Sequence, residues 1–289
     1  MKGIYTALLV SFDKEGNLNE KGLREIVRHN IDKCKVDGLY VGGSTGENFM
    51  LSTEEKKRIF EIAMDEAKGQ VKLIAQVGSV NLKEAVELAK FATDLGYDSL
   101  SAVTPFYYKF DFSEIKHYYE TIINSVDNKM IIYSIPFLTG VNMSLDQFGE
   151  LFENDKIIGV KFTAADFYLL ERMRKTFPDK LIYAGFDEMM LPATVLGVDG
   201  AIGSTFNVNG RRAKEIFEAA KSGNIEKARE IQHITNDFIT DVLENGLYQT
   251  LKGLLQEQGV DAGYCRQPMK APTEAMSKRI KEINEKYFQ

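Results

Sequence analysis

Short apolar runs alternate along the chain with segments whose apolar residues recur every three or four positions. The runs are rich in Val, Ile and Leu, which is typical of parallel strands covered on both faces. They predict strands at residues 4–12, 38–41, 72–77, 99–104, 130–135, 157–162, 181–185 and 200–204. The segments between them have helical periodicity, so the chain is expected to form βαβ units around a parallel sheet.

Local signals mark where the helices begin. Three pairs resemble capping boxes, in which two side chains satisfy backbone donors at a helix start: Ser52 with Glu55, Asn81 with Glu84, and Ser144 with Gln147. An aspartate also precedes three of the predicted strands, at Asp37, Asp98 and Asp199. The repeated joints support a regular alternation of helix and strand.

About eight such units in roughly 200–250 residues match a closed (β/α)8 barrel, the TIM barrel. An open doubly wound sheet is the alternative, but it would not explain the even spacing. The strand pattern stops after residue 207, and residues 224–243, 247–258 and 273–286 read as helices packed outside the barrel. We expect one folding unit, with the barrel core at residues 1–207 and the last barrel helix and a C-terminal helical extension at residues 208–289.

Composition narrows the function classes. A hydrophobic content of 44% is ample for a large core, and the net charge of −6 argues against nucleic acid and membrane surfaces as partners. No segment approaches the ~20 apolar residues of a membrane span. The apolar segment 4–12 follows Lys2, but no cleavage pattern of small residues follows it, so we expect a strand of a cytoplasmic protein and not a signal peptide.

Cysteines and histidines are few and scattered. Cys34 and Cys265 are far apart and are expected to be lone thiols and not a disulfide. His29, His117 and His233 lack the close spacing of metal ligands. We therefore expect no metal site.

In a barrel of this kind the chemistry lies at the C-terminal ends of the strands. One predicted strand there ends in Gly159-Val160-Lys161. Burial disfavours the charged ammonium and lowers the pKa of a lysine. A neutral amine attacks carbonyl groups to form Schiff bases, although a lysine in this position can also simply end the strand in water.

The loop after the second strand, Gly42 to Gly46, suits an anion such as a carboxylate or phosphate. Its glycines let backbone amides approach the ligand, and Ser44 and Thr45 add hydroxyl donors. The loop also matches the G-x-S-x-G pattern of a serine hydrolase, with Ser44 as nucleophile. In such hydrolases the serine lies on a sharp turn, the nucleophile elbow, and a helix begins at the serine itself. The capped helix here is predicted to begin near Ser52.

Other strand ends carry phenols and carboxylates. Tyr133 ends the fifth strand and either fills the barrel or shuttles protons beside a buried lysine. Asp187 and Glu188 follow the seventh strand, where they either favour a helix start or bind sugar hydroxyls. Tyr107 lies in an aromatic cluster after the fourth strand.

Taken together these motifs resemble the superfamily of pyruvate-dependent aldolases that comprises N-acetylneuraminate lyases and dihydrodipicolinate synthases. The resemblance extends from the first strand through the C-terminal helices. It implies that Lys161 forms the Schiff base, that Tyr133 is the catalytic tyrosine, and that Ser44 and Thr45 hold the pyruvate carboxylate. It also implies a homotetramer, built as a pair of tight dimers, in which Tyr107 reaches the neighbouring subunit's site.

The sialic acid lyase branch of the superfamily matches better than the synthase branch. The synthase branch carries an arginine at the position of Leu138, whereas Gly185-Phe186-Asp187-Glu188 matches the Gly-x-Asp-Glu motif of the lyases. The resemblance also implies substrate contacts at Thr163 and Ser204, with Tyr248 as a lesser candidate. The implied reaction cleaves N-acetylneuraminate to N-acetylmannosamine and pyruvate. It implies no metal and no other cofactor, because the imine serves as the electron sink.

Three alternatives stay open at this point. The chain could act as a synthase-like or other 2-keto-acid aldolase of the same superfamily, or as a serine hydrolase. It could also bind a sugar acid without turnover, as a sensor, although a pure binder has no need of both Lys161 and Tyr133.

Overall fold

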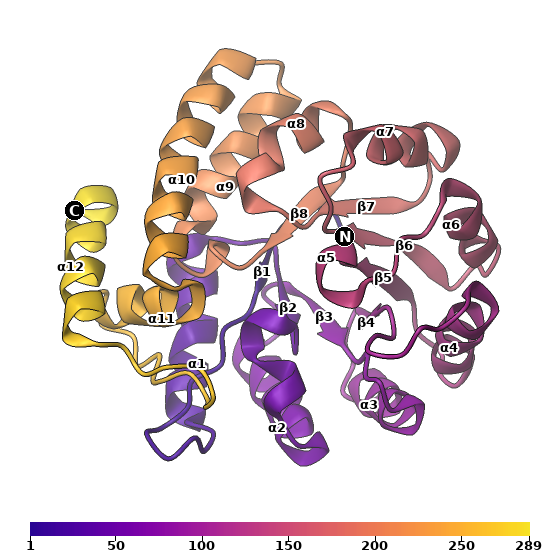
Figure 1. Ribbon diagram of the computed structural model, residues 1–289, viewed down its shortest axis with the longest axis horizontal. Coiled ribbons are helices and arrows are strands. Elements are labelled where there is room, and N and C mark those ends of the chain that lie inside the picture. Colours follow the sequence, from indigo (N-terminus) through magenta and orange to yellow (C-terminus); the bar gives the residue numbers. More distant parts are fainter.

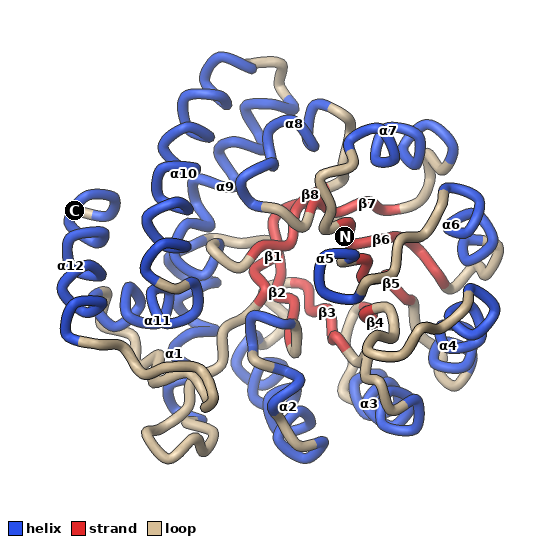
Figure 2. Tube along the Cα trace, viewed as in Figure 1, coloured by secondary structure: helices blue, strands red, loops and turns tan.

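The computed structural model describes residues 1–289 as a closed barrel of eight parallel strands with helices around it (Figures 1 and 2). Each strand pairs with the next, and the eighth closes the barrel on the first. The strands are β1 (Gly3–Ala7), β2 (Gly38–Val41), β3 (Lys72–Gln76), β4 (Ser99–Val103), β5 (Met130–Ser134), β6 (Ile157–Phe162), β7 (Leu181–Ala184) and β8 (Gly200–Gly203). The predicted TIM barrel is confirmed, and the open doubly wound sheet is wrong.

The first predicted strand is longer than the one observed. Its apolar run continues to Phe12, but the ladder of β1 ends at Ala7. Leu8, Leu9 and Val10 stay buried, and Leu8 O and Val10 Cγ2 lie close to Gly46 in the loop after β2. The backbone N–H of Leu9 donates to the Asn207 side chain (3.1 Å) and not to a strand. The apolar run from Leu8 to Phe12 therefore reflects burial of the chain beyond the end of the strand, and not strand pairing.

Helices cover the outside of the barrel. They are α1 (Glu20–His29), α2 (Thr53–Ala67), α3 (Leu82–Asp94), α4 (Phe112–Asn124), α6 (Leu145–Phe152), α7 (Phe167–Thr176), α8 (Met190–Val195) and α9 (Phe206–Lys221). Shorter elements are the π-turn η1 (Asn30–Cys34), the 3-10 turns η2 (Ser44–Gly46), η3 (Asn48–Met50) and η4 (Asp187–Met189), and the single helical turn α5 (Pro136–Thr139).

Two of the three predicted capping boxes are confirmed, at Ser52 and Ser144. The third is wrong. Asn81 caps α3 by accepting from the backbone of Lys83, but Glu84 does not reach back to it. Glu84 instead accepts from Lys56 Nζ (2.9 Å), because α2 lies beside α3 and offers a buried ammonium. A charge partner from another helix has replaced the local one.

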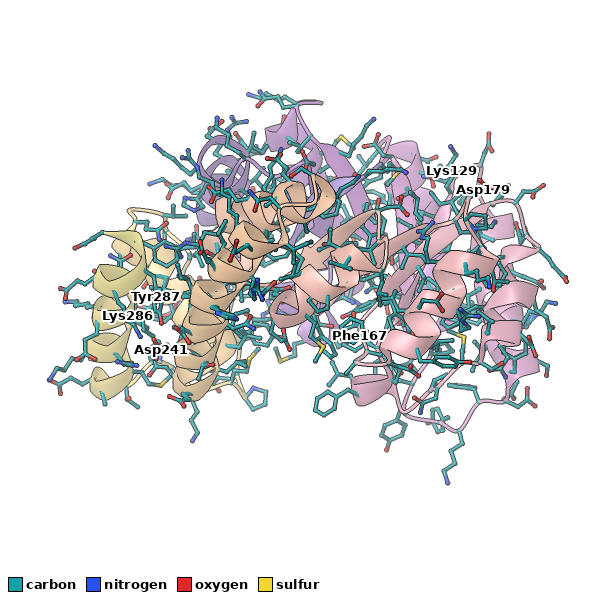
Figure 3. The ribbon with its side chains drawn as sticks, turned by 90° about the horizontal axis from the view of Figure 1, so that it is seen from above. Lys129, Phe167, Asp179, Asp241, Lys286 and Tyr287 are labelled. Carbon is teal, nitrogen blue, oxygen red and sulfur yellow. The ribbon has the colours of Figure 1, made fainter.

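The C-terminal region forms the three expected helices, α10 (Ile225–Asn245), α11 (Leu247–Glu257) and α12 (Glu274–Phe288). They gather on one side of the barrel, beside α1 and α9 (Figure 1). Asp241 of α10 accepts from Tyr287 Oη (2.7 Å) and Lys286 Nζ (3.0 Å) of α12 (Figure 3). The expected boundary after residue 207 falls in the first turn of α9, which packs on β1.

Two large apolar clusters form most of the core, beside a small third one of three alanines. The larger lies between the strands and the surrounding helices. The smaller fills the barrel and includes the tyrosines Tyr5, Tyr40, Tyr133 and Tyr183. Lys161 is in register with Tyr133 on one neighbouring strand and with Tyr183 on the other. Because paired residues of parallel strands share a face of the sheet, Lys161 points into the barrel with them.

Candidate active site

A cavity of about 290 Å³ opens at the C-terminal ends of the strands. The structure brings every expected site residue except Tyr107 to its wall: Ser44, Thr45, Tyr133, Lys161, Thr163, Gly185, Asp187, Glu188, Ser204 and Tyr248. These residues come from five strands' ends and from helix α11. Their convergence follows from barrel closure, which places the C-terminal ends of all the strands around one mouth.

Lys161 lies at the bottom of this cavity and is 5% exposed. Its Nζ is 4.1 Å from the ring centre of Tyr133 and 4.5 Å from that of Tyr40. Burial lowers the pKa of Lys161 to about 7, against a smaller opposing effect of the Asp187 carboxylate. A large fraction of Lys161 is therefore the neutral amine near neutral pH, as a nucleophile requires.

Tyr40 is a site residue that the sequence did not reveal. It lies in the middle of β2, its ring meets that of Tyr133 edge to face, and its hydroxyl donates to Ser101 Oγ (3.0 Å). The aromatic walls formed by Tyr40 and Tyr133 exclude water from Lys161. Tyr40 belongs to the site because its side chain points into the barrel, and that orientation becomes known only with the strand register.

Tyr133 is buried at the end of β5. Burial raises the pKa of Tyr133 to about 12, while the Ser44 hydroxyl opposes that rise. The backbone carbonyl of Tyr133 accepts from Thr104 Oγ1 (3.3 Å). At rest the phenol therefore keeps its proton, in contact with both the lysine and the Ser44 loop.

The loop that carries Ser44 and Thr45 folds into the 3-10 turn η2 after Gly42, which has a φ of 77° that favours glycine. Gln76 at the end of β3 donates from Nε2 to Gly42 O (3.2 Å) and so supports the loop from below. The hydroxyls of Thr45 and Ser204 are hydrogen-bonded to each other at 2.7 Å.

This geometry excludes the hydrolase elbow. The helix that follows the loop begins at Thr53, nine positions after Ser44 and not at the serine itself. None of the three histidines lines the cavity, so Ser44 has no imidazole base. The serine hydrolase alternative is wrong.

Asp187 and Glu188 lie in the turn η4 after β7. Asp187 Oδ2 accepts hydrogen bonds from the Thr205 backbone N–H (2.9 Å) and from the Thr205 hydroxyl (2.6 Å). This oxygen is therefore already hydrogen-bonded within the protein. Burial raises the pKa of Asp187 to about 6. The Glu188 carboxylate makes no hydrogen bond within the protein and lines the cavity.

Two amides of α10 hold this turn in place. Gln232 Nε2 donates to Asp187 O and Asn236 Nδ2 donates to Glu188 O, both at 3.2 Å. Neither Gln232 nor Asn236 could be identified from the sequence, since each is an ordinary polar residue in a helix. Only the packing of α10 beside η4 makes them part of the site.

Gly185 and Thr163 are in very close approach. A Cβ added to Gly185 would lie 1.9 Å from Thr163 Oγ1, so no other residue fits here without movement. Thr163 Oγ1 is buried on the cavity wall and has no hydrogen-bond partner within the protein. A bound hydroxyl would satisfy it.

Tyr107 lies apart from this cavity and is 85% exposed. Its φ of 80° is rare for a residue with a side chain. Nearby is a second, apolar cavity of about 230 Å³, whose lining includes Phe49, Phe106 and Leu138. This cavity adjoins the first, because both are lined by Ser44, Ile135, Leu138 and Tyr248.

No three His, Cys, Asp or Glu side chains come together in an arrangement that could bind a metal ion. None of the helices combines the length and the apolar character needed to cross a membrane.

Comparisons with known proteins identify the family of the chain. The model of the dihydrodipicolinate synthetase family matches residues 1–286. The N-acetylneuraminate lyase of Clostridium perfringens (strain SM101 / Type A) is 86% identical, with 100% of both chains covered. A crystal structure of CdNal from Clostridium difficile in complex with mannosamine is 82% identical (TM-score 0.99, covering 100% of this chain and 99% of that one). N-acetylneuraminate lyase from Fusobacterium nucleatum, complexed with pyruvate, is 71% identical (TM-score 0.97, covering 100% and 98%). The chain therefore belongs to the dihydrodipicolinate synthetase family.

Proposed function

We propose that the chain is a Schiff-base aldolase that reversibly cleaves N-acetylneuraminate to N-acetylmannosamine and pyruvate. The observation that carries this proposal is the buried amine of Lys161, 4.1 Å from the Tyr133 ring at the base of a polar cavity. The full-length similarity to N-acetylneuraminate lyases supports the choice of substrate. The reaction takes place in the cytoplasm.

The first steps form the imine. Neutral Lys161 attacks the C2 ketone of the open-chain sugar acid to give a carbinolamine. The carbinolamine hydroxyl takes up a proton and leaves as water, which gives a protonated imine. The hydroxyls of Ser44 and Thr45, with nearby backbone amides, hold the C1 carboxylate. The tight contact of Thr45 with Ser204 keeps these donors together at the mouth of the barrel.

Tyr133 then moves the proton that permits cleavage. Because the pKa of Tyr133 is high, the phenol is protonated at rest and acts as a proton relay, not as a preformed phenolate. It accepts the C4 hydroxyl proton while its own proton passes toward Ser44 and the substrate carboxylate. The electron pair of the C3–C4 bond flows into the imine, and N-acetylmannosamine leaves as the aldehyde. Protonation of the enamine at C3 and hydrolysis release pyruvate and restore Lys161.

The outer part of the cavity binds the sugar chain. Thr163 Oγ1 and the Glu188 carboxylate have free hydrogen-bonding capacity, and Gly185, Asp187, Ser204 and Tyr248 complete the wall. Leu138 offers no charge for a second carboxylate, which disfavours aspartate semialdehyde as the co-substrate of pyruvate.

A turnover assay tests this function. N-acetylneuraminate should release pyruvate in a coupled assay, and condensation of pyruvate with aspartate semialdehyde should be negligible. Comparable efficiency with the semialdehyde would refute the choice of branch. Binding of N-acetylneuraminate without any pyruvate release would favour a sensor.

The proposal includes a homotetramer of two tight dimers, in which Tyr107 completes the neighbouring site. The exposed side chain of Tyr107 and the apolar cavity beside Ser44 support such a crossing. Mixing Lys161→Arg subunits with Tyr107→Phe subunits should restore activity, because hybrid dimers contain one site with both residues intact. If mixed oligomers form and stay inactive, Tyr107 serves its own chain.

A further inference from the structure

A buried ion pair joins the substrate-binding loop to the C-terminal helices. Lys252 Nζ of α11 donates to Glu47 Oε1 at 2.6 Å, and the two side chains are 2% and 0% exposed. Neither residue lines the cavity that holds Lys161. The chemistry proposed above uses neither charge, although burying two charges is costly.

Both side chains of the ion pair have further partners. Besides Glu47, Lys252 Nζ donates to Tyr264 O (2.6 Å) and lies 4.9 Å from the ring centre of Phe12. The other Glu47 oxygen accepts from the backbone N–H of Arg266 at 2.7 Å. The pair is therefore held in one geometry by the segment that joins α11 to α12.

Glu47 also joins the two consecutive turns of the loop, η2 and η3. Its backbone N–H donates to Ser44 O (3.0 Å) and closes the turn η2, and its carbonyl accepts from Met50 N (2.9 Å) and opens the turn η3. Its φ of 60° is left-handed, which is unfavourable for a residue with a side chain and persists only where contacts hold it. Fixing the Glu47 side chain thus fixes the backbone on which Ser44 and Thr45 stand.

We propose that Glu47 and Lys252 are positioning residues that hold the Ser44–Thr45 loop in the conformation that receives the substrate carboxylate. Tyr248 precedes Lys252 by one helical turn of α11 and lines the cavity, so the same helix supports both the loop and the wall. The C-terminal extension thereby belongs to the active site's framework. This inference rests on the proposed function, because it takes pyruvate as the ligand of the loop.

The test compares two ketones that differ only at the carboxylate. Imine formation at Lys161 is followed by borohydride trapping with pyruvate and with pyruvamide, and the half-saturating concentration of each is measured. In Lys252→Met the half-saturating pyruvate concentration should rise by roughly 10- to 100-fold, as expected for a misplaced binding group. The value for pyruvamide should change less than threefold, because its reaction at Lys161 does not need the carboxylate contacts.

A second variant and a matched control separate positioning from stability. The double variant Glu47→Gln/Lys252→Met leaves no buried charge unpaired, and the glutamine amide oxygen can still accept from Arg266 N–H; it should show the same selective loss. Lys56→Met removes another buried lysine, paired with Glu84 at 2.9 Å on α2 and α3, and should lower thermal stability without changing the pyruvate-to-pyruvamide ratio.

An unchanged ratio in the double variant, or an equal loss for both ketones, would overturn the positioning role. A wild-type chain that traps no pyruvate at all would instead refute the proposed function.

Discussion

The buried position of Lys161 predicts how imine formation depends on pH. The reactive species is the neutral amine, and burial lowers the pKa of Lys161 from 10.5 to about 7. At pH 7 about half of the Lys161 side chains are then neutral, against about three in ten thousand for a lysine in water. Burial alone thus supplies a gain of roughly a thousandfold in nucleophile at neutral pH.

The sign and size of the pH effect follow from this value. The neutral fraction rises from about one tenth at pH 6 to about nine tenths at pH 8. The rate of imine formation should therefore rise about tenfold over that interval and then level off. Asp187→Asn removes the carboxylate that raises the pKa of Lys161, so its rising limb should shift to lower pH.

Quenched-flow trapping of pyruvate with borohydride between pH 5 and 10 measures this rate directly. Pyruvate is ionised throughout that range, so its own charge does not change. A rate that keeps climbing beyond pH 9 would show that Lys161 has an ordinary pKa and would refute the reasoning. A limb that moves to higher pH in Asp187→Asn would refute the assigned role of the carboxylate.

Three further outcomes are expected. Tyr133→Phe keeps the ring against Lys161 but removes the relay, so kcat for cleavage should fall by ~10²–10⁴-fold while pyruvate trapping persists; an unchanged kcat would exclude the relay. Gly185→Ala places a Cβ 1.9 Å from Thr163 Oγ1 and should destabilise the fold by ~1–3 kcal/mol, seen as a lower Tm; an unchanged Tm would contradict that contact. Activity should survive exhaustive EDTA treatment, and a loss reversed by zinc or magnesium would indicate a metal-dependent aldolase.

The sequence predicted the strands closely because each is buried on both faces, which leaves a continuous apolar run. The strand prediction was wrong where residues are buried but do not pair with another strand, as at Leu8 to Phe12. The capping prediction was wrong at Glu84, where a lysine from another helix outcompetes the local cap.

The site was largely predictable because barrel closure gathers the strand ends, wherever they lie in the sequence. The strand assignment was enough to place Lys161 and Tyr133 at the barrel mouth, while their expected roles came from the family resemblance. Tyr40, Gln232 and the Glu47–Lys252 pair could not be predicted, because their roles depend on register and on packing between segments far apart in the chain. Local patterns carry no information about such contacts.

The central claim is that Lys161 forms the covalent intermediate during cleavage of N-acetylneuraminate. The most direct test incubates the protein with N-acetylneuraminate, reduces it with borohydride, and maps the adduct by mass spectrometry. The account predicts a reduced pyruvyl adduct on Lys161, release of N-acetylmannosamine, and neither product with Lys161→Arg, whose guanidinium stays charged. An adduct on another lysine, or pyruvate release from Lys161→Arg at the wild-type rate, would contradict it.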